Sequence, residues 1–365
     1  MIKSSNILII GAGVSSIFPI LLGKNKVTII NEGKLFSRIL ISGNGRCNFF
    51  NDDLLNKEDV NLKLILNDDE KNYPNAVLNY IKNDLGIDYY KEKKYYYPFF
   101  NKSECFYNPL IEAFNNSNAN LILGRATSID PIKKKVVYLE NDIRNEISYQ
   151  KLIISTGGFS YLYKQDYSLI NSLNIKFNKF SPSLCPIKIK EKIPSYLVGL
   201  RLKATVYLLI DDKKAYCEEG EVLFKKDGLS GIVIFNISKV INEYINKSNI
   251  KIQINYLNHD GYQAISKKSL PEALKKYLKE ENLLNDETLT FSFSSLYSFK
   301  ESQASYGGIS LDEINLNNFT LKKYPDIYAI GEVIDLNFKC GGYNIGYNMI
   351  EGYKVINRII EDERK

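Results

Sequence analysis

The 365-residue sequence contains no tryptophan, one histidine (His259), two methionines and five cysteines. A single histidine excludes a metal site built from several histidines and leaves little basis for a Ser-His-Asp triad. The cysteines are odd in number, lie far apart and form no C-x-x-C pair, which argues against a disulfide framework or a zinc ribbon. We therefore expect no metal site and a reducing, cytoplasmic setting. The cysteines are Cys47, Cys105, Cys185, Cys217 and Cys340.

Long apolar runs are also missing. The first run, Ile7 to Ile10, ends at Gly11, and later runs are far shorter than the roughly 18 residues that span a bilayer. We expect neither a signal peptide nor a membrane helix. The formal charge is 48 − 42 = +6, but the lysines lie in short, scattered groups. This dispersed excess argues against a nucleic-acid partner and leaves a small molecule as the expected substrate.

Length and composition predict a globular protein of about two domains. Apolar residues make up 44% and charged residues 25% of the chain, and roughly 150 residues per domain is typical. The N-terminus reads as a β-α-β unit with strands at Ile7 to Ile10 and Val27 to Ile30. Short alternating strands and then helical segments fill residues 185–300, and a strand at Ile327 to Ile330 with a final helix follows. We predict an α/β Rossmann-like domain formed by residues 1–184 and 301–365, interrupted by an inserted domain.

The first glycine motif follows the first strand directly and precedes a helix. Gly11 permits the tight turn, and Gly13 lets a pyrophosphate approach the backbone at the helix N-terminus. The third position of the motif is Ser16, and the residue that contacts a ribose is either Asn31 or Glu32. The motif therefore predicts a dinucleotide site, against the alternative of a glycine turn without a ligand.

Two further segments carry glycines that suit a nucleotide. In the segment ISGNGRCN, Arg46, Cys47 and Asn48 follow Gly43 and Gly45, so the loop can meet a phosphate with backbone amides and a guanidinium. The alternative is a tight surface turn, and for the cysteine a packing role is the alternative to a redox thiol. The second segment, at the end of a predicted strand, could pass beneath a nucleotide without a side-chain clash; its residues are Thr156, Gly157 and Gly158.

The C-terminal segment YAIGEVIDLNFKCGGYNIGY carries the most informative pattern. A strand ends at Gly331 and Glu332, and a helix begins near Gly342. The acidic side chain can hold a ribityl or ribose hydroxyl, and the amides of Asn344 and Ile345 would direct the positive end of the helix at an anion. A reduced flavin carries such an anion at its pyrimidine edge, so the segment favours a flavin over NAD.

Together these strings resemble the BaiN-like and aminoacetone-oxidase-type family of FAD-dependent oxidoreductases. The strings LISGNGRCN, TGGFSY, SPSLCPI, GEVLFKKDGLSG, GGISLDEIN and IGEVIDLNFKCGGYNIGY occur in the family's order along almost the whole chain. The resemblance implies noncovalently bound FAD and a Rossmann-like domain interrupted by a small β-barrel-like part and a helical part. It also implies hydride transfer to or from a small organic substrate of the enone or amino ketone class.

Carried over by position, the resemblance assigns most of the FAD site. Gly11, Gly13 and Ser16 would face the pyrophosphate, and Asn31 or Glu32 the adenosine ribose. The remaining residues would follow the cofactor from the pyrophosphate to the flavin ring: Arg46, Cys47, Asn48, Thr156, Gly157, Gly158, Gly331, Glu332, Gly342, Asn344 and Ile345.

The sequence identifies no catalytic acid or base. Tyr161, Tyr343, Cys47 and His259 are possible, but each residue type is more often packed or on the surface. Only one nucleotide motif is present, so either NAD(P)H would bind transiently at the flavin as reductant or another reductant would serve. The alternative to an enzyme is a noncatalytic flavin-binding or redox-sensing protein.

Overall fold

The structure is a computed structural model that describes residues 4–23, 26–56, 60–161, 166–245, 249–257 and 265–364. His259, one of the possible acids or bases, lies outside the described residues. The chain forms two compact units, each with its own hydrophobic core. Unit 1 comprises Met1–Gly158, Gln165–Lys179 and Gly307–Lys365, and unit 2 comprises Phe159–Lys164 and Phe180–Tyr306.

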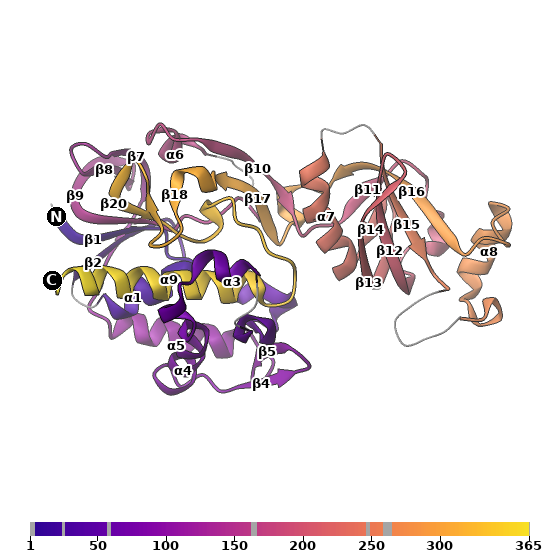
Figure 1. The fold of residues 1–365 in the computed structure, drawn as a ribbon, viewed down its shortest axis with the longest axis horizontal. Coiled ribbons are helices and arrows are strands. Elements are labelled where there is room, and N and C mark those ends of the chain that lie inside the picture. Colours follow the sequence, from indigo (N-terminus) through magenta and orange to yellow (C-terminus); the bar gives the residue numbers. More distant parts are fainter. Residues whose placement is uncertain are drawn as a thin grey trace. The chain divides into compact units, whose positions relative to one another are not determined.

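A parallel sheet forms the centre of unit 1 (Figure 1). Its five parallel strands run in the order β20-β9-β1-β2-β6, so β1 from the N-terminus and β20 from near the C-terminus flank β9 on its two sides. All five side chains of β2 are buried, as expected for a strand covered on both faces. The strands are β1 (Ser4–Ile10), β2 (Val27–Asn31), β6 (Asn120–Leu123), β9 (Ile143–Ile154) and β20 (Tyr324–Ala329).

Antiparallel strands extend this sheet at its edges. β18 (Ile314–Asn315) and β19 (Thr320–Leu321) continue it beyond β20. β7 (Arg125–Asp130) and β8 (Lys135–Glu140) form a hairpin that pairs with the first half of β9. A separate small sheet has the order β3-β5-β4, from β3 (Phe50–Asn51), β4 (Tyr89–Glu92) and β5 (Tyr95–Pro98).

Helices cover the sheet of unit 1. The longest is α9, which packs a largely buried face against η1 and α1 near the N-terminus. The helical elements of unit 1 include η1 (Val14–Ser16), α1 (Ile17–Leu22), α2 (Arg38–Ile41), η3 (Ser42–Gly45), η4 (Asp52–Leu55), α3 (Val60–Ile65), η5 (Asp68–Glu70), α4 (Tyr73–Asn83), α5 (Glu104–Asn115), α6 (Ser168–Asn171), η10 (Gly331–Val333) and α9 (Tyr343–Asp362).

Unit 2 contains a closed six-stranded antiparallel barrel. Its strands follow the order β11-β14-β13-β12-β15-β16, and buried residues alternate with accessible ones along β15. The strands are β11 (Ile187–Ile189), β12 (Arg201–Ile210), β13 (Lys213–Lys225), β14 (Gly228–Ser230), β15 (Ile250–Asn255) and β16 (Thr288–Leu296). The helices are α7 (Ile232–Tyr244) and α8 (Glu272–Glu280), and the ribbon of β10 (Phe177–Ser183) with β17 (Ala304–Ile309) spans the boundary between the units in the sequence. The predicted fold class, a Rossmann-like α/β domain with a barrel-like and helical insertion, is confirmed.

Candidate functional site

Three of the predicted glycine segments meet where parallel strands of unit 1 end. The backbone N–H of Gly11 donates to the carbonyl of Ile30 at 2.9 Å. The N–H of Ser155 donates to Ile10 at 2.8 Å, and that of Ile330 to Ile154 at 3.0 Å. These bonds align the chain after β1, β9 and β20 along one edge, which is where open α/β sheets bind ligands.

Two of these positions accept only glycine. Gly11 has φ +93°, and a Cβ there would lie 2.4 Å from the carbonyl oxygen of Ser155. Gly331 has φ +78°, and its Cβ would lie 2.5 Å from Ser15 Oγ. L-amino acids with side chains rarely adopt such dihedrals, so both the backbone and the neighbours require glycine. The strand ends therefore present bare backbone.

Serines tie the first motif together. The hydroxyls of Ser15 and Ser155 hydrogen-bond at 2.7 Å, joining the loops after β1 and β9. Ser16 is fully buried, and its Oγ donates to the carbonyl of Gly13 at 2.8 Å. The helix that approaches this turn most closely is α9, because a Cβ on its Gly352 would lie only 2.1 Å from the carbonyl oxygen of Ser15. Serine thus fits at the third motif position because its hydroxyl bonds within its own turn.

The two alternatives for the ribose contact take different positions. Asn31 is buried, accepts the N–H of Ala12 at Oδ1 at 2.9 Å, and donates from Nδ2 to the carbonyl of Gly33 at 3.0 Å. Both ends of this amide therefore hold the glycine loop. Glu32 is exposed at the same strand end. Of the two side chains, Glu32 is the one available to an external hydroxyl.

A buried carboxyl group beneath this edge was not predicted. Glu351 of α9 is 2% exposed, and its Oε2 accepts the N–H of Gly331 at 2.7 Å. Burial raises the pKa of this carboxyl to about 7, although the hydrogen bond from Gly331 opposes the shift. The side chain fixes the turn that carries Glu332, which is itself half-buried in η10.

A second cluster surrounds the start of α9. Gly342 has φ +84°, and a Cβ there would lie 2.6 Å from Asn48 Oδ1 and 2.4 Å from the carbonyl oxygen of Phe50. Asn51 Nδ2 donates to the carbonyl of Gly341 at 2.7 Å. Among the described residues Asn48 Oδ1 is buried and has no hydrogen-bond partner. A buried acceptor without a partner is costly, so this atom suits a ligand N–H.

Arg46 lies close in sequence to this cluster, but its side chain is directed to the β4–β5 hairpin. Its Nε donates to Asn101 Oδ1 at 2.7 Å, and Nη2 forms an ion pair with Glu92 at 3.1 Å. The guanidinium carbon lies 4.3 Å from the centre of the Tyr97 ring. Hydrogen bonds to Tyr90 and Glu92 raise the pKa of the guanidinium despite desolvation. The guanidinium therefore holds the hairpin in place.

The other predicted residues occupy varied positions. Cys47 is buried, and burial raises the pKa of its thiol to about 12, which suits a packing role and not a redox thiol. Asn344 donates from Nδ2 to the carbonyl of Lys339, in the loop before α9, at 3.2 Å, and Ile345 is half-buried. Thr156 is exposed, and Gly157 (φ +71°) and Gly158 follow it directly after β9.

The possible acids and bases have different surroundings. Tyr343 is buried, and its hydroxyl donates to Asp53 of η4, which forms an ion pair with Lys94 at 3.1 Å. Tyr161 is 36% exposed.

No group of three or more potential metal ligands occurs in the part of the chain that the structure describes. Within the same residues, no helix is both long and apolar enough to cross a membrane.

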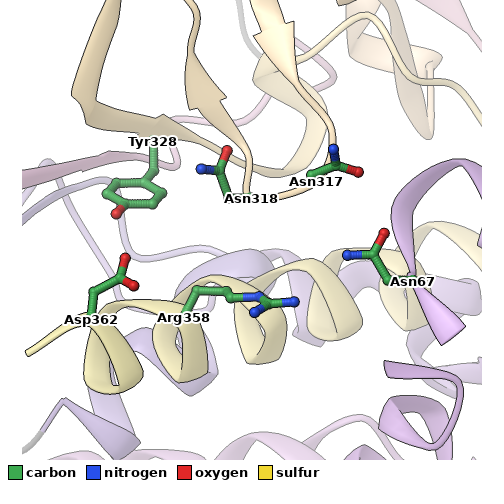
Figure 2. Close-up of a pocket in the computed structure, with 6 residues that line it drawn as sticks. All are labelled: Asn67, Asn317, Asn318, Tyr328, Arg358 and Asp362. Carbon is green, nitrogen blue, oxygen red and sulfur yellow. The ribbon is translucent and has the colours of Figure 1, made fainter. Parts of the chain in front are cut away.

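A polar cavity of about 340 Å³ lies elsewhere in unit 1 (Figure 2). None of the predicted site residues lines it. Its lining residues are Asn67, Asn317, Asn318, Tyr328, Arg358 and Asp362. Arg358 is already bonded to Glu70, so this guanidinium is not free for a phosphate, and the strand ends remain the candidate site.

Comparison with known proteins extends over nearly the whole chain. The model of the HI0933-like protein Rossmann domain matches residues 5–356. A ribosomal RNA dihydrouridine synthase of Haemophilus influenzae is 24% identical, covering 97% of this chain and 98% of that protein. A second one, of Escherichia coli, is 21% identical over 92% of this chain and 93% of its own. A 3-dehydro-bile acid delta(4,6)-reductase of Clostridium scindens is 20% identical, with 94% and 96% covered.

Proposed function

We propose that this chain, which belongs to the HI0933-like Rossmann family of flavoprotein oxidoreductases, uses FAD to reduce a carbon–carbon double bond conjugated to a carbonyl group. The substrate we propose is a uridine within RNA. The observation that carries the cofactor assignment is the pair of bare-backbone clusters, at the strand ends and at the start of α9, with the unpartnered Asn48 Oδ1 in the second.

The names of the relatives describe one class of reaction. Making dihydrouridine saturates the C5=C6 bond of uracil, which is conjugated to the C4 carbonyl. A delta(4,6)-reductase acting on a 3-dehydro bile acid saturates double bonds conjugated to a ketone. For such a conjugated bond, the electron pair would enter as hydride at the carbon remote from the carbonyl, and a proton would complete the adjacent carbon. Two of the three relatives act on RNA, which favours uridine.

The residues of unit 1 fit FAD. Gly11, Gly13 and Ser16 would present the amides of η1 to the pyrophosphate, with Glu32 at the adenosine ribose. Thr156, Gly157 and Gly158 would line the path, with Gly331 and Glu332 on the ribityl side. The bound flavin would supply the electron pair.

The start of α9 would hold the flavin ring. The backbone amides of Asn344 and Ile345, next to Gly342 in the first turn of a 20-residue helix, place a positive dipole end where the reduced ring is anionic. Asn48 Oδ1 would accept a ring N–H. We assign Cys47 to packing, and Arg46 to holding the hairpin instead of contacting the pyrophosphate.

NADH or NADPH would reduce the flavin directly, because the chain carries one glycine motif of the dinucleotide type. A second candidate substrate is a steroid-like enone, which the bile-acid reductase favours. Of the two predicted substrate classes, the names of these relatives support the enone, and none of them mentions an amino ketone.

The test begins with the visible spectrum of the purified protein, followed by anaerobic NADPH and then NADH. We expect a flavin spectrum that bleaches, and reoxidation on addition of a ribosomal RNA transcript or a steroid 4-en-3-one. Replacing Asn48 by leucine should weaken FAD binding about tenfold, the effect of roughly 1.4 kcal/mol, by removing one hydrogen bond. Asn120→Leu, on an exposed position of β6, is the control. A flavin that neither reductant bleaches would favour the noncatalytic flavin-binding or redox-sensing alternative.

A further inference from the structure

Two exposed phenylalanines follow β5 in unit 1. Phe99 is 58% and Phe100 74% exposed, and they are the only exposed phenylalanines among the described residues. Their ring centres lie 5.5 Å apart with the planes at 87°. Burying such a side chain against a partner is favourable, because apolar surface leaves water. An adjacent exposed pair is therefore the kind of surface that binds a partner.

The pair is held in a defined conformation. The N–H of Phe99 donates to the carbonyl of Asp88 at 2.9 Å, which extends the β4–β5 pairing by one residue. Asn101 N–H closes a turn onto Pro98 at 2.8 Å. Ser103 then joins the segment to η3, its N–H donating to Gly45 at 2.7 Å. The two rings are thus presented on a turn that is fixed on both sides.

More aromatic surface continues from this turn toward the proposed flavin cluster. Tyr90 and Tyr97 stack across the hairpin with centres 5.7 Å apart and planes at 27°. The guanidinium of Arg46 lies over the Tyr97 ring, and Arg46 is two residues before Asn48 in the sequence. We call Tyr90, Tyr97, Phe99 and Phe100 the aromatic platform. Arg46 therefore connects it to the loop that would contact FAD.

Lysines and acidic residues both surround the platform. Residues 88–104 contain four lysines and three acidic residues, Asp88, Glu92 and Glu104. Lys91 pairs with Asp52 at 2.7 Å and Lys94 with Asp53 at 3.1 Å. Lys93 and Lys102 are exposed and make no ion pair within the described ranges. Two cations are thus left for phosphates beside rings on which bases can stack.

We propose that the aromatic platform binds an unpaired stretch of RNA next to the uridine that is reduced. The inference rests on the proposed function and adds the surface that would recognise the substrate. Proteins bind single-stranded RNA by stacking its bases on aromatic side chains while lysines and arginines contact the backbone. Phe99 and Phe100 would receive bases, and Lys93 and Lys102 would lie near the phosphates.

The test compares the holoenzyme with its F99A/F100A variant. Binding of a fluorescent twelve-nucleotide oligouridylate is measured by anisotropy, and the rate at which NADPH bleaches the bound flavin is measured in parallel. We expect the variant to lose at least tenfold in RNA affinity while its FAD content and its rate of flavin reduction stay unchanged. Ile132→Ala, at an exposed turn between β7 and β8, is the matched control and should bind RNA like the wild type.

The outcomes separate the two proposals. If wild type binds RNA and F99A/F100A binds it equally well, the proposal that the aromatic platform binds RNA is wrong, while the proposed substrate stands. If wild type reduces the enone but neither binds nor reduces RNA, the proposed uridine substrate is wrong and the platform falls with it. A change in oligomeric state in F99A/F100A without loss of RNA affinity would mean that the platform contacts a second copy of the chain. The K93E/K102E variant should in addition lower the salt dependence of RNA binding.

Discussion

Asn31 and Ser16 show how single side chains adapt a common motif. Each replaces a residue that the motif favours, and each uses its polar atoms within the loop that it belongs to. The loop is therefore held by its own side chains before any ligand contributes. The hydroxyl pair of Ser15 and Ser155 adds a cross-link between two strand ends. In the proposed site, ligand contacts would come from backbone amides and from Glu32.

The buried carboxyl of Glu351 should make the stability of the protein depend on pH. Its native pKa of about 7 lies above the ordinary value of 4.5, so the native state holds a proton that the unfolded chain releases between these values. Stability from this group therefore falls as pH rises from 4.5 to 7, by about 3 kcal/mol in total. Glu351→Gln removes the titration, so we expect its stability relative to wild type to increase from pH 5 to pH 8.

Urea unfolding at pH 5, 6.5 and 8 measures this difference. Glu112→Gln, at an exposed position of α5, is the control for losing one carboxyl group. A constant difference between Glu351→Gln and wild type across this range would contradict a buried, titrating carboxyl.

At the scale of elements, α9 joins the two halves of the candidate site. Its first residues face Asn48 and Phe50, and Glu351 and Gly352 meet the strand ends about two to three turns later. The glycines let this helix approach two backbones closely. Displacing α9 would therefore disturb both clusters together.

A buried ion pair anchors the C-terminal half of α9. Lys354 is fully buried, lies 2.9 Å from Glu70, and also donates to the carbonyl of Leu316 at 3.3 Å. Lys354→Met leaves Glu70 paired with Arg358. We expect a loss of about 3 kcal/mol in the free energy of unfolding, because Glu70 keeps only one of its two cationic partners and the carbonyl of Leu316 loses its donor.

Chemical denaturation of Lys354→Met measures this loss. The control is Lys275→Met on α8, whose partner Glu272 is highly exposed, and which should cost less than about 0.5 kcal/mol. Equal effects of the two substitutions would show that burial does not strengthen the α9 pair.

At the scale of the whole molecule, the chain has two separate hydrophobic cores. One lies around the parallel sheet of unit 1, and the other lies in the barrel of unit 2. The residues proposed to hold FAD all belong to unit 1. We therefore expect FAD to stabilise one unit directly.

Calorimetry tests this expectation. Two unfolding transitions should appear, and FAD at 100 times its Kd should stabilise one of them by about 2.7 kcal/mol. Ile252→Ala removes a fully buried side chain of β15 and should lower the other transition, by about 2 to 5 kcal/mol. A single transition that both changes move together would show that the units unfold as one.

Much of the fold follows from local sequence. The apolar strands β1, β2 and β20, the turns at Gly11 and Gly331, and α9 were all predicted, because apolar runs and glycines act over a few neighbouring residues. The predicted insertion likewise matches the barrel and its helices. The hairpin of β7 and β8 was missed, because its identity depends on pairing with the first half of β9.

Local residue patterns were enough to indicate the Rossmann-like class and the segments that form the candidate site. Which side chains lie at that site depends on how the chain folds. Asn31 turns inward, Arg46 joins the hairpin, and Glu351 reaches Gly331 from 20 residues away. These outcomes depend on contacts between segments far apart in the chain, and no local pattern of residues encodes them.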